Sequence, residues 1–140
     1  MSRHAGSIAL LMATLALIGC SNTGVFVTVS AITIVAATPP STGTLTTDAN
    51  NIETWTPDTA AAGPQTLQLS AEISPANAST KTVTWSSSDS NAPQLISVDS
   101  SGLVTVAAGF TGNGGNYLIT ASATDYSGTK GTFEVSVAGN

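Results

Sequence analysis

The feature that most constrains the fold of this chain is a strict alternation of apolar and polar residues from Thr66 to Ile73. In this stretch every second residue is Leu, Ala or Ile, and the residues between them are Gln, Ser and Glu. A period of two places all the apolar side chains on one face of a β-strand and all the polar ones on the other. The chain must therefore supply a second β-layer to cover the apolar face.

Further short strands follow at regular intervals, with turn residues between them. We expect these strands at residues 82–86, 96–98, 104–106, 116–124 and 132–137. Between two of them, Asp99-Ser-Ser-Gly102 predicts a tight turn in which the glycine has a positive φ and Asp99 accepts hydrogen bonds from turn amides. No stretch after Cys20 has a helical period. The predicted fold is all-β, with two packed antiparallel sheets.

The alternation also predicts which side chains form the core. We expect Trp85 to be its central aromatic residue. The other expected core residues are Leu67, Leu69, Val83, Ile96, Val98, Val104, Ile119, Phe133 and Val135. Burying one large apolar side chain contributes roughly 1.5–3 kcal/mol, so this set is sufficient for a small domain after chain entropy is subtracted.

Several stretches carry a family resemblance. They are Leu67-Gln-Leu-Ser-Ala71, Ser74-Pro-Ala-Asn77, Lys81-Thr-Val-Thr-Trp-Ser-Ser-Ser-Asp89, Val98-Asp-Ser-Ser-Gly-Leu-Val-Thr-Val106, Ala108-Gly109, Ile119-Thr-Ala121 and Val135-Ser-Val137. Residues 66–137 thereby resemble a bacterial immunoglobulin-like domain of group 2, the intimin/invasin type. The resemblance implies an immunoglobulin-like sandwich over residues 31–140, whose first strand is residues 31–35. The loop at 38–65, an expected long connection or irregular hairpin, and the insertion at 110–115 depart from the family pattern.

The N-terminal residues have the parts of a secretory signal peptide. Arg3 lies in a short basic start, an apolar run extends to Ile18, and Gly19 precedes Cys20. Leu17-Ile-Gly-Cys20 resembles a bacterial lipobox, in which cleavage precedes the cysteine and its thiol is lipidated. This resemblance implies a signal peptide at 1–19, a tether at 20–30, and a membrane anchor through lipid on Cys20.

The expected location is the bacterial cell envelope, with the protein secreted and lipid-anchored at the outer membrane or cell surface. Ser21 after the cysteine permits outer-membrane sorting by the same resemblance. The alternative is that the apolar run is retained as a membrane helix, because no charged residue occurs between Arg3 and Asp48. The polar residues 21–24 interrupt the run and argue against that alternative.

Composition excludes several classes of function. The chain has 3 basic and 8 acidic residues and a net charge of −5, which becomes more negative if Arg3 leaves with the signal peptide. Such a chain cannot form a cationic surface for nucleic acid. The one histidine, His4, lies in the leader and the one cysteine is Cys20. Catalysis by Ser–His or Cys–His pairs and zinc binding are therefore excluded, and we expect no enzyme activity, metal or cofactor.

Three aromatic residues are candidates for ligand contact: Trp55, Phe110 and Tyr126. All three lie in predicted loops, where an aromatic ring can stack on a sugar or anchor another chain. The alternative for Trp55 is a cap over the end of the core. Asp48, Asp58, Asp99 and Asp125 are candidates for calcium binding at a sandwich end, and the alternative is that they form turns.

Three functions follow from these observations. The first is a non-catalytic surface lipoprotein whose immunoglobulin-like domain serves adhesion or acts as a structural spacer. The second is a subunit of an extracellular fibre, in which residues 25–35 add a strand to a neighbouring subunit's sheet and Thr38-Pro-Pro40 is the hinge. The third is a carbohydrate-binding module that recognises surface glycans through the loop aromatics.

Overall fold

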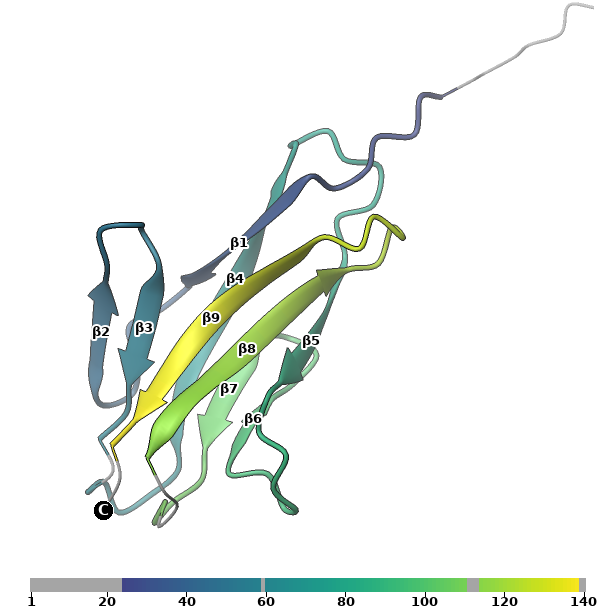
Figure 1. The fold of residues 1–140 in the computed structure, drawn as a ribbon. Coiled ribbons are helices and arrows are strands. Elements are labelled where there is room, and N and C mark those ends of the chain that lie inside the picture. The colour runs from purple at the N-terminus through teal and green to yellow at the C-terminus, as the bar shows by residue number, and fades with distance from the viewer. Residues whose placement is uncertain (1–23, 59, 111–113, 139–140) are drawn as a thin grey trace, which may run out of the picture.

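A computed structural model describes residues 24–58, 60–110 and 114–138 of the chain. This part of the chain forms two facing β-sheets and contains no helix, which confirms the predicted all-β sandwich (Figure 1). The strands are β1 (Ala31–Ala36), β2 (Thr44–Thr47), β3 (Glu53–Thr56), β4 (Gln65–Ser74), β5 (Val83–Ser87), β6 (Ile96–Val98), β7 (Leu103–Val106), β8 (Gly115–Ala123) and β9 (Lys130–Val137).

The two sheets have the order β1-β4-β7-β6 and β2-β3-β9-β8-β5. The first sheet and the β9-β8-β5 part of the second have the strand order of a constant-type immunoglobulin domain. Neighbouring strands are antiparallel, with the exception of β3 and β9, which run parallel at Thr54–Trp55 and Glu134–Val135. The expectation of antiparallel sheets is therefore wrong for this one pair. β3 belongs to the long connection between β1 and β4, and no hairpin turn joins it to β9, so the two strands need not be antiparallel.

The long connection at residues 38–65 contains the hairpin of β2 and β3, which extends the second sheet. Its turn is closed by the carboxylate of Asp48, which accepts hydrogen bonds from the amides of Asn50 and Ile52 at 2.8 Å each. Carboxylate-to-amide bonds of this kind let aspartate form a turn without help from the rest of the fold. The predicted irregular hairpin is thus a regular part of the sheet.

Most of the expected core residues lie at the centre of the sandwich. Leu67, Leu69, Ile96, Val104, Ile119, Phe133 and Val135 are each 2% exposed or less. Val83, Trp85 and Val98 are half-buried and pack against this core. These three lie on β5 and β6, the strands at the edges of the two sheets. An edge strand has a neighbour on one side only, which leaves these three side chains in partial contact with water.

The prediction that Trp85 is the central buried aromatic is wrong. The fully buried indole belongs to Trp55, which is 0% exposed and donates a hydrogen bond from Nε1 to the carbonyl of Thr42 at 3.0 Å. Trp55 lies on β3, between β2 and β9, whereas Trp85 lies on an edge. The ring of Trp85 instead covers the turn at Gly102, where an added Cβ would lie 3.0 Å from its Cζ2 atom.

The segment before β1 is attached to the domain by hydrogen bonds on both sides. Val29 is buried; its amide donates to the Asp125 carboxylate at 2.5 Å, and its carbonyl accepts from the Thr129 hydroxyl at 2.9 Å. The Ser79 amide donates to the carbonyl of Val27 at 2.8 Å. The sandwich therefore begins at about residue 27, inside the segment predicted as a tether.

The predicted signal peptide and Cys20 lie outside the described residues. Within the residues that the structure does describe, no helix is long and apolar enough to cross a membrane.

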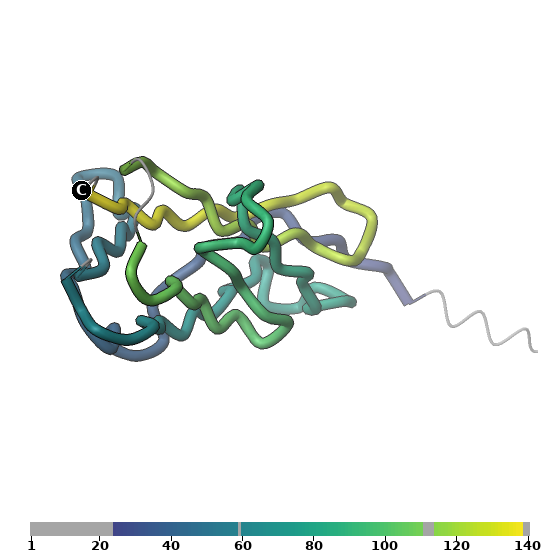
Figure 2. The backbone as a smooth tube through the Cα atoms, turned by 90° about the horizontal axis from the view of Figure 1, so that it is seen from below, coloured from purple at the N-terminus to yellow at the C-terminus, as the bar shows by residue number. Residues whose placement is uncertain are grey.

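β1 closes the sandwich on the side where it lies against β9. A Cβ added to Gly131 on β9 would lie 2.6 Å from the carbonyl oxygen of Ile32 on β1. Glycine is therefore required here for close approach of two backbones. The segment before β1 leaves the sandwich at one end, and β9 finishes at the other, as both views show (Figures 1 and 2).

Candidate functional site

Tyr126 is the most exposed large hydrophobic side chain that the structure describes. It lies in the turn between β8 and β9, and its φ is 64°. This left-handed conformation is uncommon for any residue with a Cβ, and Asn and Gly are the residues usually found in it. The turn therefore holds a bulky aromatic ring in water on a backbone that does not favour it.

Hydrogen bonds to the segment before β1 fix the turn that carries Tyr126. Asp125 is buried, and its carboxylate accepts hydrogen bonds from the amides of Val29 at 2.5 Å and Ser127 at 3.0 Å. Thr129 bonds to the carbonyl of Val29 through its hydroxyl. Both residues that flank the turn are thus bonded to the segment before β1. This clamp, formed by Asp125 and Thr129, fixes the backbone of the turn from which the ring projects.

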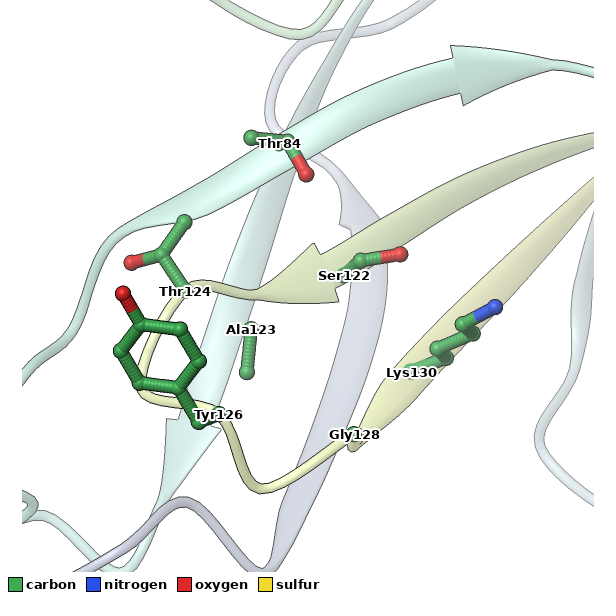
Figure 3. Close-up of a pocket in the computed structure, with 7 residues that line it drawn as sticks. All are labelled: Thr84, Ser122, Ala123, Thr124, Tyr126, Gly128 and Lys130. Atoms are coloured by element: carbon green, nitrogen blue, oxygen red, sulfur yellow. The ribbon is translucent and has the colours of Figure 1, made fainter.

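A shallow groove of about 410 Å³ lies beside the ring, on the outer face of the second sheet. Its walls include Thr84, Ser122, Ala123, Thr124, Tyr126 and Lys130 (Figure 3). We call it the Tyr126 groove.

Strand register brings the polar residues of the Tyr126 groove together. Thr84 on β5 faces Ser122 on β8, and Ser122 faces Lys130 on β9. The three side chains form a row across three neighbouring strands. Thr124 completes the rim beside the ring, where its hydroxyl donates to the carbonyl of Thr82 at 3.1 Å. Lys130 is the one charged residue in the row.

Trp55 and Phe110 do not reach this surface. Trp55 is fully buried, and Phe110 is 3% exposed and packs edge-on against Tyr117 with a centroid separation of 6.1 Å. Both rings therefore belong to the core, and their prediction as ligand contacts is wrong. Their segments have no alternation, so sequence gave no sign of the direction in which the rings point.

The four aspartates considered for calcium form turns. Asp48, Asp58, Asp99 and Asp125 each accept a hydrogen bond from a backbone amide two residues further along the chain. For Asp99 this bonding pattern is the one predicted from Asp99-Ser-Ser-Gly102, since its carboxylate also accepts from the Leu103 amide at 3.0 Å. In the described ranges, no group of three His, Cys, Asp or Glu residues is placed to hold a metal ion.

The carboxylates of Asp48, Asp89, Asp99 and Asp125 should make the stability of the domain depend on acid pH. Burial raises the pKa of Asp89, but hydrogen bonds from the amides of Asn91, Ile96 and Leu95 outweigh it and hold the pKa below its ordinary value. The pKa values of Asp48, Asp99 and Asp125 are also lowered, chiefly by hydrogen bonds from the Ile52 amide, the Ser101 hydroxyl and the Ser127 hydroxyl respectively.

A carboxyl whose pKa is lowered by folding stabilises the fold above its unfolded-state pKa and loses that contribution as the pH falls through its folded-state pKa. We therefore expect a constant melting temperature from pH 7 to about pH 5 and a steep fall below about pH 4. Thermal melts at constant ionic strength measure this, and Asp89→Asn should weaken the dependence. A melting temperature that stays constant down to pH 2 would contradict the assignment.

The sequence of the chain matches a known family of protein domains. Residues 48–133 match the bacterial Ig-like domain (group 2). This match covers more than half of the chain. The protein belongs to the group 2 bacterial Ig-like domain family. No curated protein matches the chain in a sequence search.

In this group 2 bacterial Ig-like domain, Tyr126 is the predicted ligand residue that lies at the surface, and the row formed by Thr84, Ser122 and Lys130 was not predicted. The alternation of polar and apolar residues could have shown that these side chains face outward, because all three occupy outward positions of their strands. The pairing register that places Thr84 beside Ser122 joins β5 and β8, which lie far apart in the sequence. Alternation identifies the face of one strand, whereas register identifies which residues of different strands are neighbours.

Proposed function

We propose that the protein is a non-catalytic, lipid-anchored component of the bacterial cell surface, in which the immunoglobulin-like domain serves adhesion or acts as a spacer. The observation that carries this proposal is the arrangement of the domain's two ends. The N-terminal segment follows the lipobox-like sequence at Cys20 and enters one end of the sandwich, and β9 finishes at the opposite end (Figure 1). Membership of the group 2 family supports it.

The attachment of the N-terminal segment suits a domain that is held at one end. From Val27 onward the segment is bonded to the turn after β4, to the Asp125–Thr129 clamp and to β4 itself. Few residues separate Cys20 from this attachment, and a chain spans at most about 3.3–3.6 Å per residue. A lipid on Cys20 would therefore keep the domain close to the membrane, with its β9 end directed outward.

A non-catalytic role agrees with the way the described acids are used. Asp48, Asp58, Asp89, Asp99 and Asp125 accept amide hydrogen bonds within their own turns. Carboxylates committed in this way stabilise loops. The lowered pKa values of Asp48, Asp89, Asp99 and Asp125 disfavour the protonated form that a general acid requires.

Mass spectrometry of the protein purified from native membranes tests the anchor. We expect the mature chain to begin at Cys20 and to carry acyl groups, and Cys20→Ser to abolish both the modification and the membrane association. Ser is close in size to Cys, so the variant changes the chemistry of one atom. An unmodified chain that still contains residues 1–19 would overturn the lipid anchor and favour the retained membrane helix.

The fibre alternative stays a prediction. In the described structure β1 pairs with β4 of its own chain through residues Ala31–Ala36. A fibre would need the same pairing to form between chains, with Thr38-Pro-Pro40 as the hinge.

A further inference from the structure

The exposed ring of Tyr126 projects from a turn whose backbone conformation is unfavourable for a bulky residue. A fully exposed aromatic gains nothing from burial, and a φ of 64° disfavours a bulky residue. The Asp125–Thr129 clamp nevertheless fixes the turn by hydrogen bonds to the segment before β1. Such unfavourable backbone conformations persist where the surroundings determine them, and they occur preferentially at ligand-binding positions.

The Tyr126 groove adds the chemistry of a specific ligand. Figure 3 shows the ring of Tyr126 on one side and Lys130 on the other, with Ser122 and Ala123 between them and Thr84 beyond. The ring offers apolar surface, while Thr84, Ser122 and Lys130 offer hydrogen-bonding groups. A pyranose sugar has the matching pattern, because its C–H groups form an apolar face and its hydroxyls surround the rim.

From this arrangement we infer that the Tyr126 groove binds a saccharide, with the ring of Tyr126 stacked on the face of a pyranose. The inference deepens the proposed adhesive role and rests on it, because it names the class of molecule that the domain recognises. The Tyr126 turn lies at the end of the sandwich that the N-terminal segment enters, so the saccharide would belong to the layer next to the anchoring membrane. The groove's volume of about 410 Å³ falls in the range of small-ligand sites.

Lys130 gives the site a charge preference. It is the charged residue among those that line the groove, and the ammonium group lies in the row with Ser122 and Thr84. The chain as a whole carries −5, so this cation is a local exception on an acidic protein. A sugar that bears a carboxylate therefore gains an interaction that a neutral sugar lacks.

Binding of the full-length chain in detergent to an array of immobilised glycans tests the inference. The array carries neutral probes, such as chitin and cellulose oligosaccharides, and carboxylated ones, such as oligogalacturonates. We expect binding to at least one probe, with the carboxylated class preferred. Tyr126→Asn should reduce the affinity by about tenfold or more, the size of a stacking interaction, and Lys130→Gln should remove the preference for carboxylated probes.

Matched variants separate loss of the site from loss of the fold. Asn tolerates a positive φ, so Tyr126→Asn should melt at the same temperature as the natural chain or higher. Tyr126→Phe keeps the ring and should keep binding. Leu118→Asn removes another exposed apolar side chain from β8, outside the groove, and should leave binding unchanged.

Two results would overturn the inference: no binding to any glycan on the array, or binding that Tyr126→Asn does not weaken. Self-association of the chain that Tyr126→Asn abolishes, with no glycan bound, would assign the ring to a protein interface and also overturn it. None of these measurements depends on Cys20. A failed glycan assay and a failed lipid assay therefore refute different statements.

Discussion

Replacing Trp55 with alanine should lower the free energy of unfolding by about 3–5 kcal/mol. The indole is fully buried between the sheets, and its Nε1 atom bonds to the carbonyl of Thr42. The substitution leaves a cavity and an unpaired carbonyl at the place where β3 joins β9. Small domains are stable by about 5–15 kcal/mol, so the variant should lose a large share of its stability. Urea titration followed by circular dichroism measures the change without depending on either indole.

Trp85→Ala is the matched control for Trp55→Ala. Its ring is half-buried on the edge strand β5, so we expect a smaller loss of about 1–3 kcal/mol. A larger loss for Trp85 than for Trp55 would show that the core is centred on β5 and not on the β3–β9 pair.

Gly131→Ala should lower the free energy of unfolding by about 2–3 kcal/mol. The added Cβ would lie 2.6 Å from the carbonyl oxygen of Ile32 and 2.9 Å from its Cγ2 atom. Neither the oxygen nor the strand that carries it can move without disturbing the ladder between β1 and β4. The overlap therefore separates β1 from β9.

Gly63→Ala provides the comparison for Gly131→Ala, because no atom lies within 4 Å of its added Cβ and its φ is not positive. We expect a change below about 0.5 kcal/mol, as for most surface substitutions. Equal effects at the two glycines would mean that β1 does not close the sandwich against β9. Thermal melts and amide hydrogen exchange in β1 measure both variants.

The strands after Thr66 could be predicted from the sequence because alternation is a local property. Residues 66–73 fall within β4, and the expected strand 132–137 falls within β9. The turn at Asp99 was predictable for the same reason, since its hydrogen bonds join residues a few positions apart. In each case the physical cause lies within the segment itself.

The depth of a side chain could not be predicted in this way. Trp55 and Trp85 both point inward, and their different burial depends on which strand lies inside its sheet. That order is set by pairing between β3 and β9, which come from opposite ends of the domain sequence. The Tyr126 groove has the same origin, because the row of Thr84, Ser122 and Lys130 exists only once three strands are in register.

The arrangement of β1 and β9 also determines how the domain would respond to tension. The two strands run in the same direction on the same side of the sandwich, and the chain enters beside the start of β1 and leaves after the end of β9 (Figure 1). A force that pulls residues 24 and 138 apart is therefore directed along β1 and loads its ladder with β4 in shear. The bonds of that ladder must rupture together, whereas peeling would break them singly. We therefore expect the domain to resist unfolding when these two ends are pulled apart.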